Sequence, residues 1–215
     1  MFWFDNQEAI GGPGKVVELD ETCFGKRKNH KGRKLGQVWV FGGYERVSKK
    51  RFLVPLLKFK EDDDKDDQES AATDDPEVEK RDAPTLIPLI QKFVVPGSTI
   101  TTDCWGAYLS NYADRELKDY THKFVNHRRG FVNPEDKTAH TQSVEWMWLD
   151  VKTWSQRPGM RGKYFKQYFG RYLFLHDHED NAVHKFLEEA GKLYRHPGAR
   201  SEQQCAIPES DCEED

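Results

Sequence analysis

The stretch HTQSVEWMWLDVK, residues 140–152, predicts a helix that packs against a core. Val144, Met147, Trp148 and Val151 follow one another at i, i+3, i+4 and i+7. This spacing places four apolar side chains on one stripe of a helix, which a folded domain buries.

Polar side chains lie along one edge of the same predicted helix. Glu145 and Lys152 are seven residues apart, which places them about 20° apart around a helix axis of 3.6 residues per turn. Gln142, three residues before Glu145, joins that side. The edge is either the salt-bridged rim of an ordinary amphipathic helix, with Lys152 a solvated partner of Glu145, or part of a functional site.

Strand-like and helix-like segments alternate in the rest of the chain. Three β-rich runs joined by short connections predict an antiparallel meander, and strands and helices then alternate up to the 140–152 helix and two further helices. This order predicts an α/β fold: a mixed five-stranded sheet with helices on both faces. The expected strands are 15–24, 37–47, 51–59, 98–105 and 122–127, and the expected helices before residue 140 are 85–94 and 107–117.

Two acidic residues stand inside apolar strand-like runs, far from Glu145 in the sequence. Asp20 follows Val16, Val17 and Leu19, and Asp103 follows Ile100 and two threonines. A buried carboxylate is costly unless it is paired or binds a metal ion, although each Asp alone also suits a strand-end turn or a helix cap. If the first and fourth strands are neighbours, both side chains converge, and Glu145 approaches them from the helix.

Three carboxylates around one point repel each other unless cations neutralise them. Oxygen ligands of this kind favour Mg²⁺ or Mn²⁺ over zinc. Two such ions about 3.5–4 Å apart stabilise both the attacking and the leaving oxygen in phosphodiester cleavage. Asp20, Asp103 and Glu145 are therefore candidate catalytic residues and metal ligands, with Lys152 a candidate contact to a DNA phosphate.

The charge of the chain is strongly segregated. Residues 61–82 carry a net charge of −9 and residues 201–215 a net charge of −6, whereas the rest carries +11 within a formal total of −4. The acidic stretches are predicted to be a disordered surface insertion and a disordered tail. The basic remainder is compatible with a polyanion such as DNA.

Basic runs adjoin two of the predicted strands, and they are either solvated loops or phosphate contacts. The candidate DNA-binding residues besides Lys152 are Lys26, Arg27, Lys28, Arg33, Arg128 and Arg129. His127 and His140 are expected near the site as hydrogen-bond donors. Trp105 is either a core aromatic or a platform for an unpaired base.

Several classes of protein are not expected. No histidine pair combines with cysteines at finger-like spacing, so no zinc site is predicted. The four cysteines (Cys23, Cys104, Cys205 and Cys212) show no CxxC spacing and are expected to be reduced thiols. No signal peptide or run of eighteen apolar residues is present, so no membrane association is predicted.

Several sequence blocks, taken in order, resemble the catalytic domain of Merlin-type transposases, the eukaryotic relatives of bacterial ISXO-like insertion-sequence transposases. They are KVVELDETCFGKRK, WVFGGYER, TLIPLI, PGSTITTDCWGAY, FVNHRRGFVNP and AHTQSVEWMWLDVK, and the similarity runs from about residue 11 to about residue 178. The resemblance implies an RNase H-like, retroviral-integrase-type fold.

The same resemblance implies a DDE metal site that acts on DNA. Carried over by motif, its acids are Asp20 in ELDE, Asp103 in TTDCWGAY and Glu145 in HTQSVE. Some bacterial relatives have Asn where Gln142 stands, so Gln142 is expected to support the site. The resemblance further implies two divalent ions, transposon ends and target DNA as partners, an oligomer on DNA, and the nucleus as location if the chain is eukaryotic.

The expected layout is a leader (1–14), a catalytic domain (15–195) with the acidic insertion at about 61–82, and an acidic tail (196–215). Two functions remain open. The first is a metal-dependent strand transferase that cleaves and joins DNA ends. The second is a transposase-derived, non-catalytic DNA- or chromatin-binding protein, suggested by the acidic segments and the short stretch before the first strand.

Overall fold

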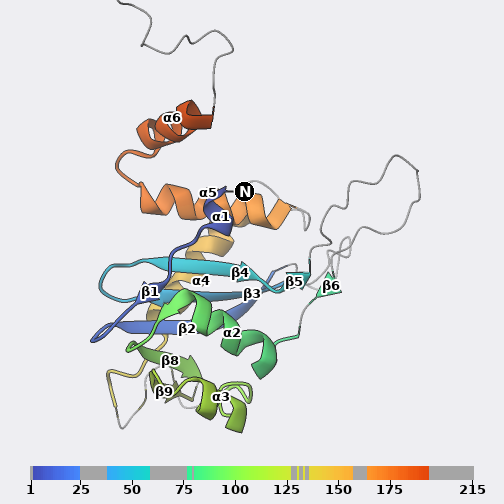
Figure 1. Cartoon of the computed structure of the whole chain (residues 1–215), viewed down its shortest axis with the longest axis vertical. Helices are drawn as coiled ribbons and strands as arrows, with labels where there is room; N and C mark the ends of the chain where they lie inside the picture. The colour runs from blue at the N-terminus through green and yellow to red at the C-terminus, as the bar shows by residue number, and fades with distance from the viewer. Residues whose placement is uncertain are drawn as a thin grey trace, which may run out of the picture. The chain divides into compact units, whose positions relative to one another are not determined.

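The computed structural model describes residues 2–24, 38–58, 77–78, 80–126, 130, 133, 136–156 and 164–193. Figure 1 shows the arrangement of its helices and strands. In chain order these are α1 (Phe2–Asp5), β1 (Ile10–Gly11), β2 (Val16–Phe24), β3 (Val38–Glu45), β4 (Arg51–Pro55), β5 (Leu57–Lys58), β6 (Glu77–Val78), α2 (Ala83–Phe93), β7 (Val94–Val95), β8 (Thr99–Asp103), α3 (Asn111–Glu116), β9 (Thr121–Val125), α4 (Gln142–Gln156), α5 (Phe165–Asp177) and α6 (Ala182–Leu193).

The central sheet has five strands in the order β4-β3-β2-β8-β9. β4, β3 and β2 form the predicted antiparallel meander. β8 and β9 then add parallel to β2 and to each other, because a helical connection precedes each of them. The predicted α/β architecture, a mixed sheet of five strands with helices on both faces, is the one observed.

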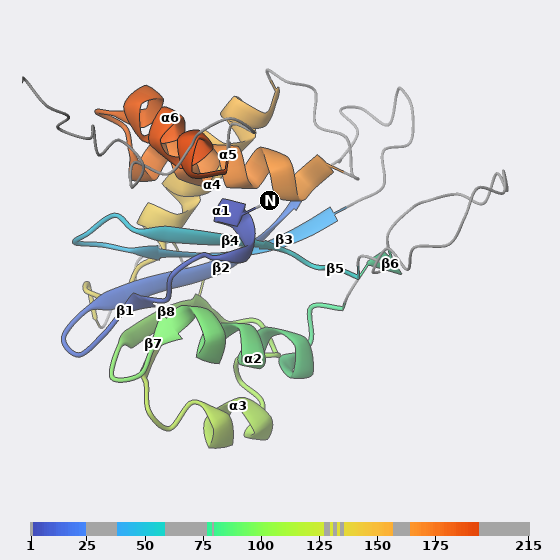
Figure 2. The ribbon, with the colours of Figure 1, turned by 45° about the horizontal axis from the view of Figure 1, so that its top comes forward.

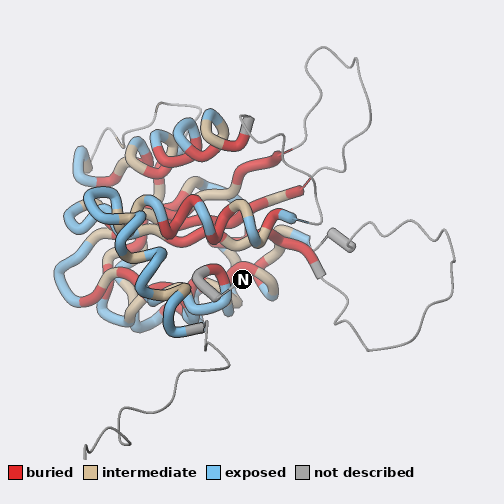
Figure 3. The backbone as a smooth tube through the Cα atoms, turned by 90° about the horizontal axis from the view of Figure 1, so that it is seen from above, coloured by how far each residue is buried: buried red, intermediate tan, exposed pale blue. Residues whose placement is uncertain are grey.

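Each face of the sheet carries its own core. On one face, α2 and α3 cover a core that includes Val17, Leu19 and Ile100. On the other, α4 and α5 cover a second core built around Trp148 and Phe169. Figure 2 shows α2 and α3 on one side of the sheet and α4 and α5 on the other, and Figure 3 shows that the strands between them are largely buried.

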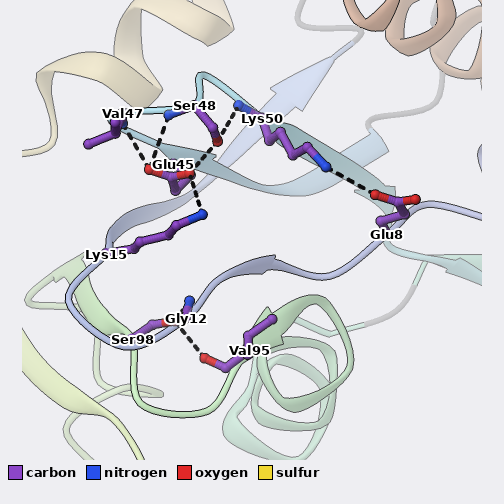
Figure 4. Close-up of polar contacts among 9 residues, drawn as sticks. All are labelled: Glu8, Gly12, Lys15, Glu45, Val47, Ser48, Lys50, Val95 and Ser98. Atoms are coloured by element: carbon purple, nitrogen blue, oxygen red, sulfur yellow. Dashed lines mark hydrogen bonds and ion pairs between the residues drawn. The ribbon is translucent and has the colours of Figure 1, made fainter.

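The predicted leader is packed. Phe4 in α1 is buried in the second core, which α5 also covers. Ile10 in β1 pairs with Val94 in β7. Gly12 N donates to Ser98 Oγ (2.7 Å), which in turn donates to the Val95 carbonyl (2.5 Å; Figure 4). Sequence reasoning missed α1, β1 and β7 because strands of two residues and a helix of four have no readable periodicity.

The predicted disordered insertion is partly ordered: Glu77 and Val78 form β6, which pairs with β5. Lys80, Arg81 and Asp82 are described, and Asp82 is the N-cap of α2, where its carboxylate accepts from the Thr85 amide (3.2 Å). Residues 59–76 and 79, and the predicted tail at 196–215, lie outside the described residues. α2 continues through Pro88 without interruption, from Ala83 to Phe93.

Contacts divide the chain into two units, Met1–Asp177 and His178–Asp215. The sheet, both cores and all predicted acids of the site belong to the first unit. The described part of the second unit is α6 with its preceding turn, and Val183, Phe186 and Leu187 are exposed on it. Among the described helices, none has the length and apolar character needed to cross a bilayer.

Candidate active site

Asp20 lies in the middle of the sheet, on the face that α4 covers. Val17 and Leu19 belong to the core under α2, and successive residues of a strand point to opposite faces. Glu18 and Asp20 therefore point toward the other face. Glu18 shows this directly, because its carboxylate accepts hydrogen bonds from backbone amides in the first turn of α4.

Asp103 is the last residue of β8, the parallel neighbour of β2. Glu18 pairs with Thr101 in this ladder, so Asp103, two residues farther on, is level with Asp20 and shares its face. The Asp103 carboxylate accepts one hydrogen bond, from the Trp105 amide (3.0 Å). The expectation that the first and fourth predicted strands are neighbours is thus confirmed.

Glu145 enters from α4, whose predicted apolar stripe is buried in the second core. The helix lies directly over the strand residues beside Asp20: Gly42 pairs with Asp20 across β2 and β3, and a Cβ placed on Gly42 would lie 2.6 Å from Trp148 Cη2. Glu145 is in the first turn of α4, half-buried. One edge of the helix thus brings a third carboxylate toward the two aspartates.

The three acids interact electrostatically. Burial, the carboxylates of Glu21 and Glu145, and that of Asp103 raise the pKa of Asp20 well above its ordinary value, against a smaller lowering by a backbone hydrogen bond. In the described part of the chain, no Lys, Arg or His lies within 4.0 Å of a carboxylate oxygen of Asp20, Asp103 or Glu145. The cluster is an excess of negative charge that the described cations do not neutralise.

Across residues 2–24, 38–58, 80–126 and 136–193, as far as they are described, no three His, Cys, Asp or Glu side chains are arranged so that they could hold a metal ion. The three acids share a face and an electrostatic field, but their side chains do not converge on one point. Their oxygen atoms are nevertheless the ligand type that Mg²⁺ and Mn²⁺ take.

A second acidic group lies on the opposite face of β2. Burial raises the pKa of Glu21 to about 7, with Asp103 adding to the rise, while a hydrogen bond from Tyr108 and the charge of Arg81 oppose it. The Arg81 guanidinium is 3.7 Å from Glu21 and is stacked over Trp39 at 3.5 Å and over Trp105 at 4.8 Å. This arrangement gives Glu21 a partner that the three site acids lack.

The other predicted site residues fall into three groups. Lys152 is half-buried on α4, and in the described part of the chain it forms no ion pair with Glu145. Gln142 is exposed at the start of α4. Lys26, Arg27, Lys28, Arg33, His127, Arg128 and Arg129 lie outside the described residues.

His140 lies beside Glu18. Its Nδ1 is 3.1 Å from Glu18 Oε1 but is not placed to form a hydrogen bond. Burial and the charge of Arg46 lower the pKa of His140, with Glu18 opposing them. In the described structure it therefore adjoins a buried glutamate that sequence reasoning did not select.

Sequence reasoning missed Glu18, Arg46 and Glu21. Glu18 stands between Val17 and Leu19 in an apolar strand, as Asp20 does beside Leu19, so the same signal was available. Trp105 also differs from the expected core aromatic, because it is 41% exposed and donates its Nε1–H to the Arg81 carbonyl (2.9 Å). Among the described cysteines, Cys104 is an exposed free thiol.

No curated protein matches the chain. Among solved structures, it is similar to a chain of the cryo-EM structure of the simian T-cell lymphotropic virus intasome in complex with the PP2A regulatory subunit B56 gamma. The TM-score is 0.41 at 14% identity, over 96% of this chain and 62% of that chain. The protein spans less than two thirds of the length of that chain.

The family comparison is more specific. Residues 11–177 match the ISXO2-like transposase domain. The matched segment begins at β1 and ends with α5, so it contains the whole five-stranded sheet and all three acids. Since this is most of the 215 residues, the chain belongs to the ISXO2-like transposase domain family.

Proposed function

We propose that the protein is a metal-dependent DNA strand transferase that cleaves transposon ends and joins them to target DNA. The observation that supports this most is the gathering of Asp20, Asp103 and Glu145 from three remote segments onto one face of the sheet. There burial raises the pKa of Asp20, and the carboxylates of Glu21, Glu145 and Asp103 add to the rise. Family membership over residues 11–177 agrees with it.

The residues fit a site for divalent cations in chemistry and charge. All three candidate ligands offer carboxylate oxygens, which suit Mg²⁺ or Mn²⁺, and the excess negative charge has no partner among the described basic residues. Two such ions supply charge neutralisation at the attacking and leaving oxygens of a phosphodiester. The proposal requires the three side chains to rotate until they converge.

In this proposal each element has one task. β2 and β8 hold Asp20 and Asp103 side by side, since adjacent parallel strands fix their spacing. α4 supplies Glu145 from above and Lys152 two turns later, where an ammonium can contact a phosphate. Gln142 and His140 are the supporting residues beside the three acids. The basic residues 26–28, 33, 128 and 129 supply further phosphate contacts.

The partners follow from the same proposal. DNA ends and target DNA are the substrates, and an oligomer assembled on DNA brings two ends together. The nucleus is the expected location if the chain belongs to the eukaryotic Merlin-type branch.

The test is DNA nicking by the whole protein. With Mn²⁺, the protein should nick supercoiled plasmid DNA and transfer an oligonucleotide 3′-hydroxyl into it. Asp103→Asn keeps the shape of the side chain but removes its charge, so both products should fall by at least about a hundredfold. Asp119→Asn, at an exposed position away from the sheet face, is the matched control and should retain activity. Equal activity in wild type and Asp103→Asn would refute the proposal.

A second function has one observation in its favour. The described His, Cys, Asp and Glu side chains form no arrangement that could hold a metal ion, which suits a non-catalytic DNA- or chromatin-binding protein. Such a protein would bind DNA in a salt-sensitive manner, unaffected by Mn²⁺ or by Asp20→Asn. Binding of this kind without any nicking would favour the second function.

A further inference from the structure

Glu18 is a fully buried carboxylate at the point where β2 meets α4. Its Oε2 accepts from the amides of Ser143 (2.7 Å) and Val144 (2.9 Å), and its Oε1 accepts from Ser143 Oγ (3.0 Å) and Arg46 Nε (2.6 Å). The two amides belong to the first turn of α4, where backbone N–H groups have no partner within the helix. A negative charge is favourable at that end of a helix.

Arg46 extends the same network to the segment before α4. Its Nη1 donates to the Thr138 carbonyl (2.7 Å) and its Nη2 to the His140 carbonyl (2.8 Å). Its own amide donates to the Val16 carbonyl (3.1 Å) of β2. Arg46 therefore links the buried carboxylate and the segment before the helix through its guanidinium, and β2 through its backbone amide.

We infer that Glu18 and Arg46 are positioning residues, which together fix the start of α4 and hence Glu145 relative to Asp20. The effect of this positioning on catalysis rests on the proposed function. Glu18 and Asp20 are alternate residues on one face of β2, about 6.6 Å apart along the strand. Glu145 directly follows Val144, whose amide Glu18 holds.

Apolar packing does not give this control. The helix is buried in the second core by its apolar stripe, Val144, Met147, Trp148 and Val151. Hydrophobic burial, however, is non-directional. A helix held only in this way can slide or rotate by a fraction of a turn. Charge-assisted hydrogen bonds from two successive amides to Glu18 fix both the position of the helix along its axis and its rotation about that axis.

Glu18 is not a fourth ligand in this reading. Both of its oxygens already accept from protein donors, and Arg46 lies against it as counter-ion. A carboxylate in that state has no lone pair facing the other acids without first breaking a bond to the helix. Its role is therefore exerted through the position of Glu145.

Glu45 offers a matched control on the neighbouring strand. It is also a buried glutamate, 1% exposed, that accepts from backbone amides: those of Val47 (2.9 Å) and Ser48 (3.2 Å). Figure 4 shows these bonds together with Lys15, 3.6 Å away. Glu45 caps the β3–β4 turn and makes no described contact with α4, so it reports the general cost of altering a buried glutamate.

The experiment compares Glu18→Gln with Glu45→Gln in the full chain by two measurements. The first is amide hydrogen exchange of residues 141–147 without metal, which should speed up about tenfold or more in Glu18→Gln only, because an amide group cannot accept from all these donors. The second is the Mn²⁺ concentration for half-maximal nicking, which should rise about tenfold. The rate at saturating Mn²⁺ should stay within about threefold of wild type, since the three acids are intact.

A second variant covers the case in which Glu18→Gln does not fold. Arg46→Lys keeps the positive charge but loses the fork that holds the two carbonyls, and it should produce the same two shifts. Unchanged exchange and an unchanged Mn²⁺ midpoint in the folded variants would overturn the inference, as would equal changes in Glu45→Gln. If wild type does not nick at all, the proposed function fails, and hydrogen exchange alone then decides whether Glu18 holds α4.

Discussion

At the residue scale, the buried acids of β2 have two different environments. Asp20 faces two other carboxylates without a described cation, whereas Glu21, on the other face, has Arg81 and Tyr108 as partners. Sequence patterns identified Asp20, because an acid in an apolar strand is conspicuous. They did not separate it from Glu18 and Glu21, since only tertiary contacts assign each acid its partners.

Glu21 leads to a prediction about pH. Its pKa is raised from 4.5 to about 7 in the folded protein, so the folded state holds this proton more tightly than the unfolded state. Its contribution to stability is fully present below about pH 4.5 and is lost as pH rises through about 7. In EDTA, the unfolding free energy of wild type should fall by on the order of 3 kcal/mol between low and high pH, at ~1.4 kcal/mol per pKa unit of Glu21. Glu21→Gln, which cannot titrate, should not show this fall.

Glu45→Gln is the control with the opposite sign. Burial alone would raise the pKa of Glu45, but hydrogen bonds from Ser48 and Val47 and the charge of Lys15 lower it. Its stabilising contribution is present above the unfolded pKa and is lost as pH falls. Urea unfolding of both variants between pH 4 and pH 8 tests the difference, and parallel pH profiles for both variants and wild type would contradict it.

At the element scale, the site depends on how closely α4 lies over β3. The apolar stripe of residues 144–151 predicted this burial correctly, and the meander and the parallel strands also match their predicted positions. The close approach itself was not predictable, because Gly42 reads as an ordinary strand glycine until the partner helix is known. The order of the strands was not predictable from periodicity either, because periodicity does not indicate which strands pair.

Gly42→Ala should destabilise the protein by about 1–3 kcal/mol. The added methyl group would lie 2.6 Å from Trp148 Cη2 and 3.1 Å from Met147 Cε, so the helix must move away from the sheet. Urea unfolding measures the loss. Gly106→Ala adds the same atom where nothing lies within 4 Å and should change stability by less than about 0.5 kcal/mol; equal effects at both positions would refute the packing argument.

At the scale of the whole molecule, charge is divided between a basic body and acidic segments. Composition alone revealed this division, whereas the boundary of the acidic insertion required the structure. Arg81 stacks on a tryptophan and Asp82 caps α2, so both residues belong to the folded domain. The placement of the basic residues 26–34, 128 and 129 lies outside the described residues.

We expect the acidic segment to weaken non-specific DNA binding. Residues 61–76 carry a net charge of −8, and replacing them with a Gly/Ser segment of equal length removes this charge without changing the chain length. Affinity for a random duplex should then rise several-fold at low salt, with a difference that shrinks as salt screens the charge. Fluorescence anisotropy across a salt series measures it, and identical affinities at low salt would contradict the prediction.

Binding of Mn²⁺ tests the central claim most directly, because it needs neither a DNA sequence nor turnover. Electron paramagnetic resonance of free Mn²⁺ at pH 7.5 should show binding by wild type. Asp20→Asn, Asp103→Asn and Glu145→Gln should each weaken this binding at least about tenfold, while Asp119→Asn should leave it unchanged. Absence of binding by wild type, or equal binding by all four variants, would contradict the assignment of Asp20, Asp103 and Glu145 as one metal site.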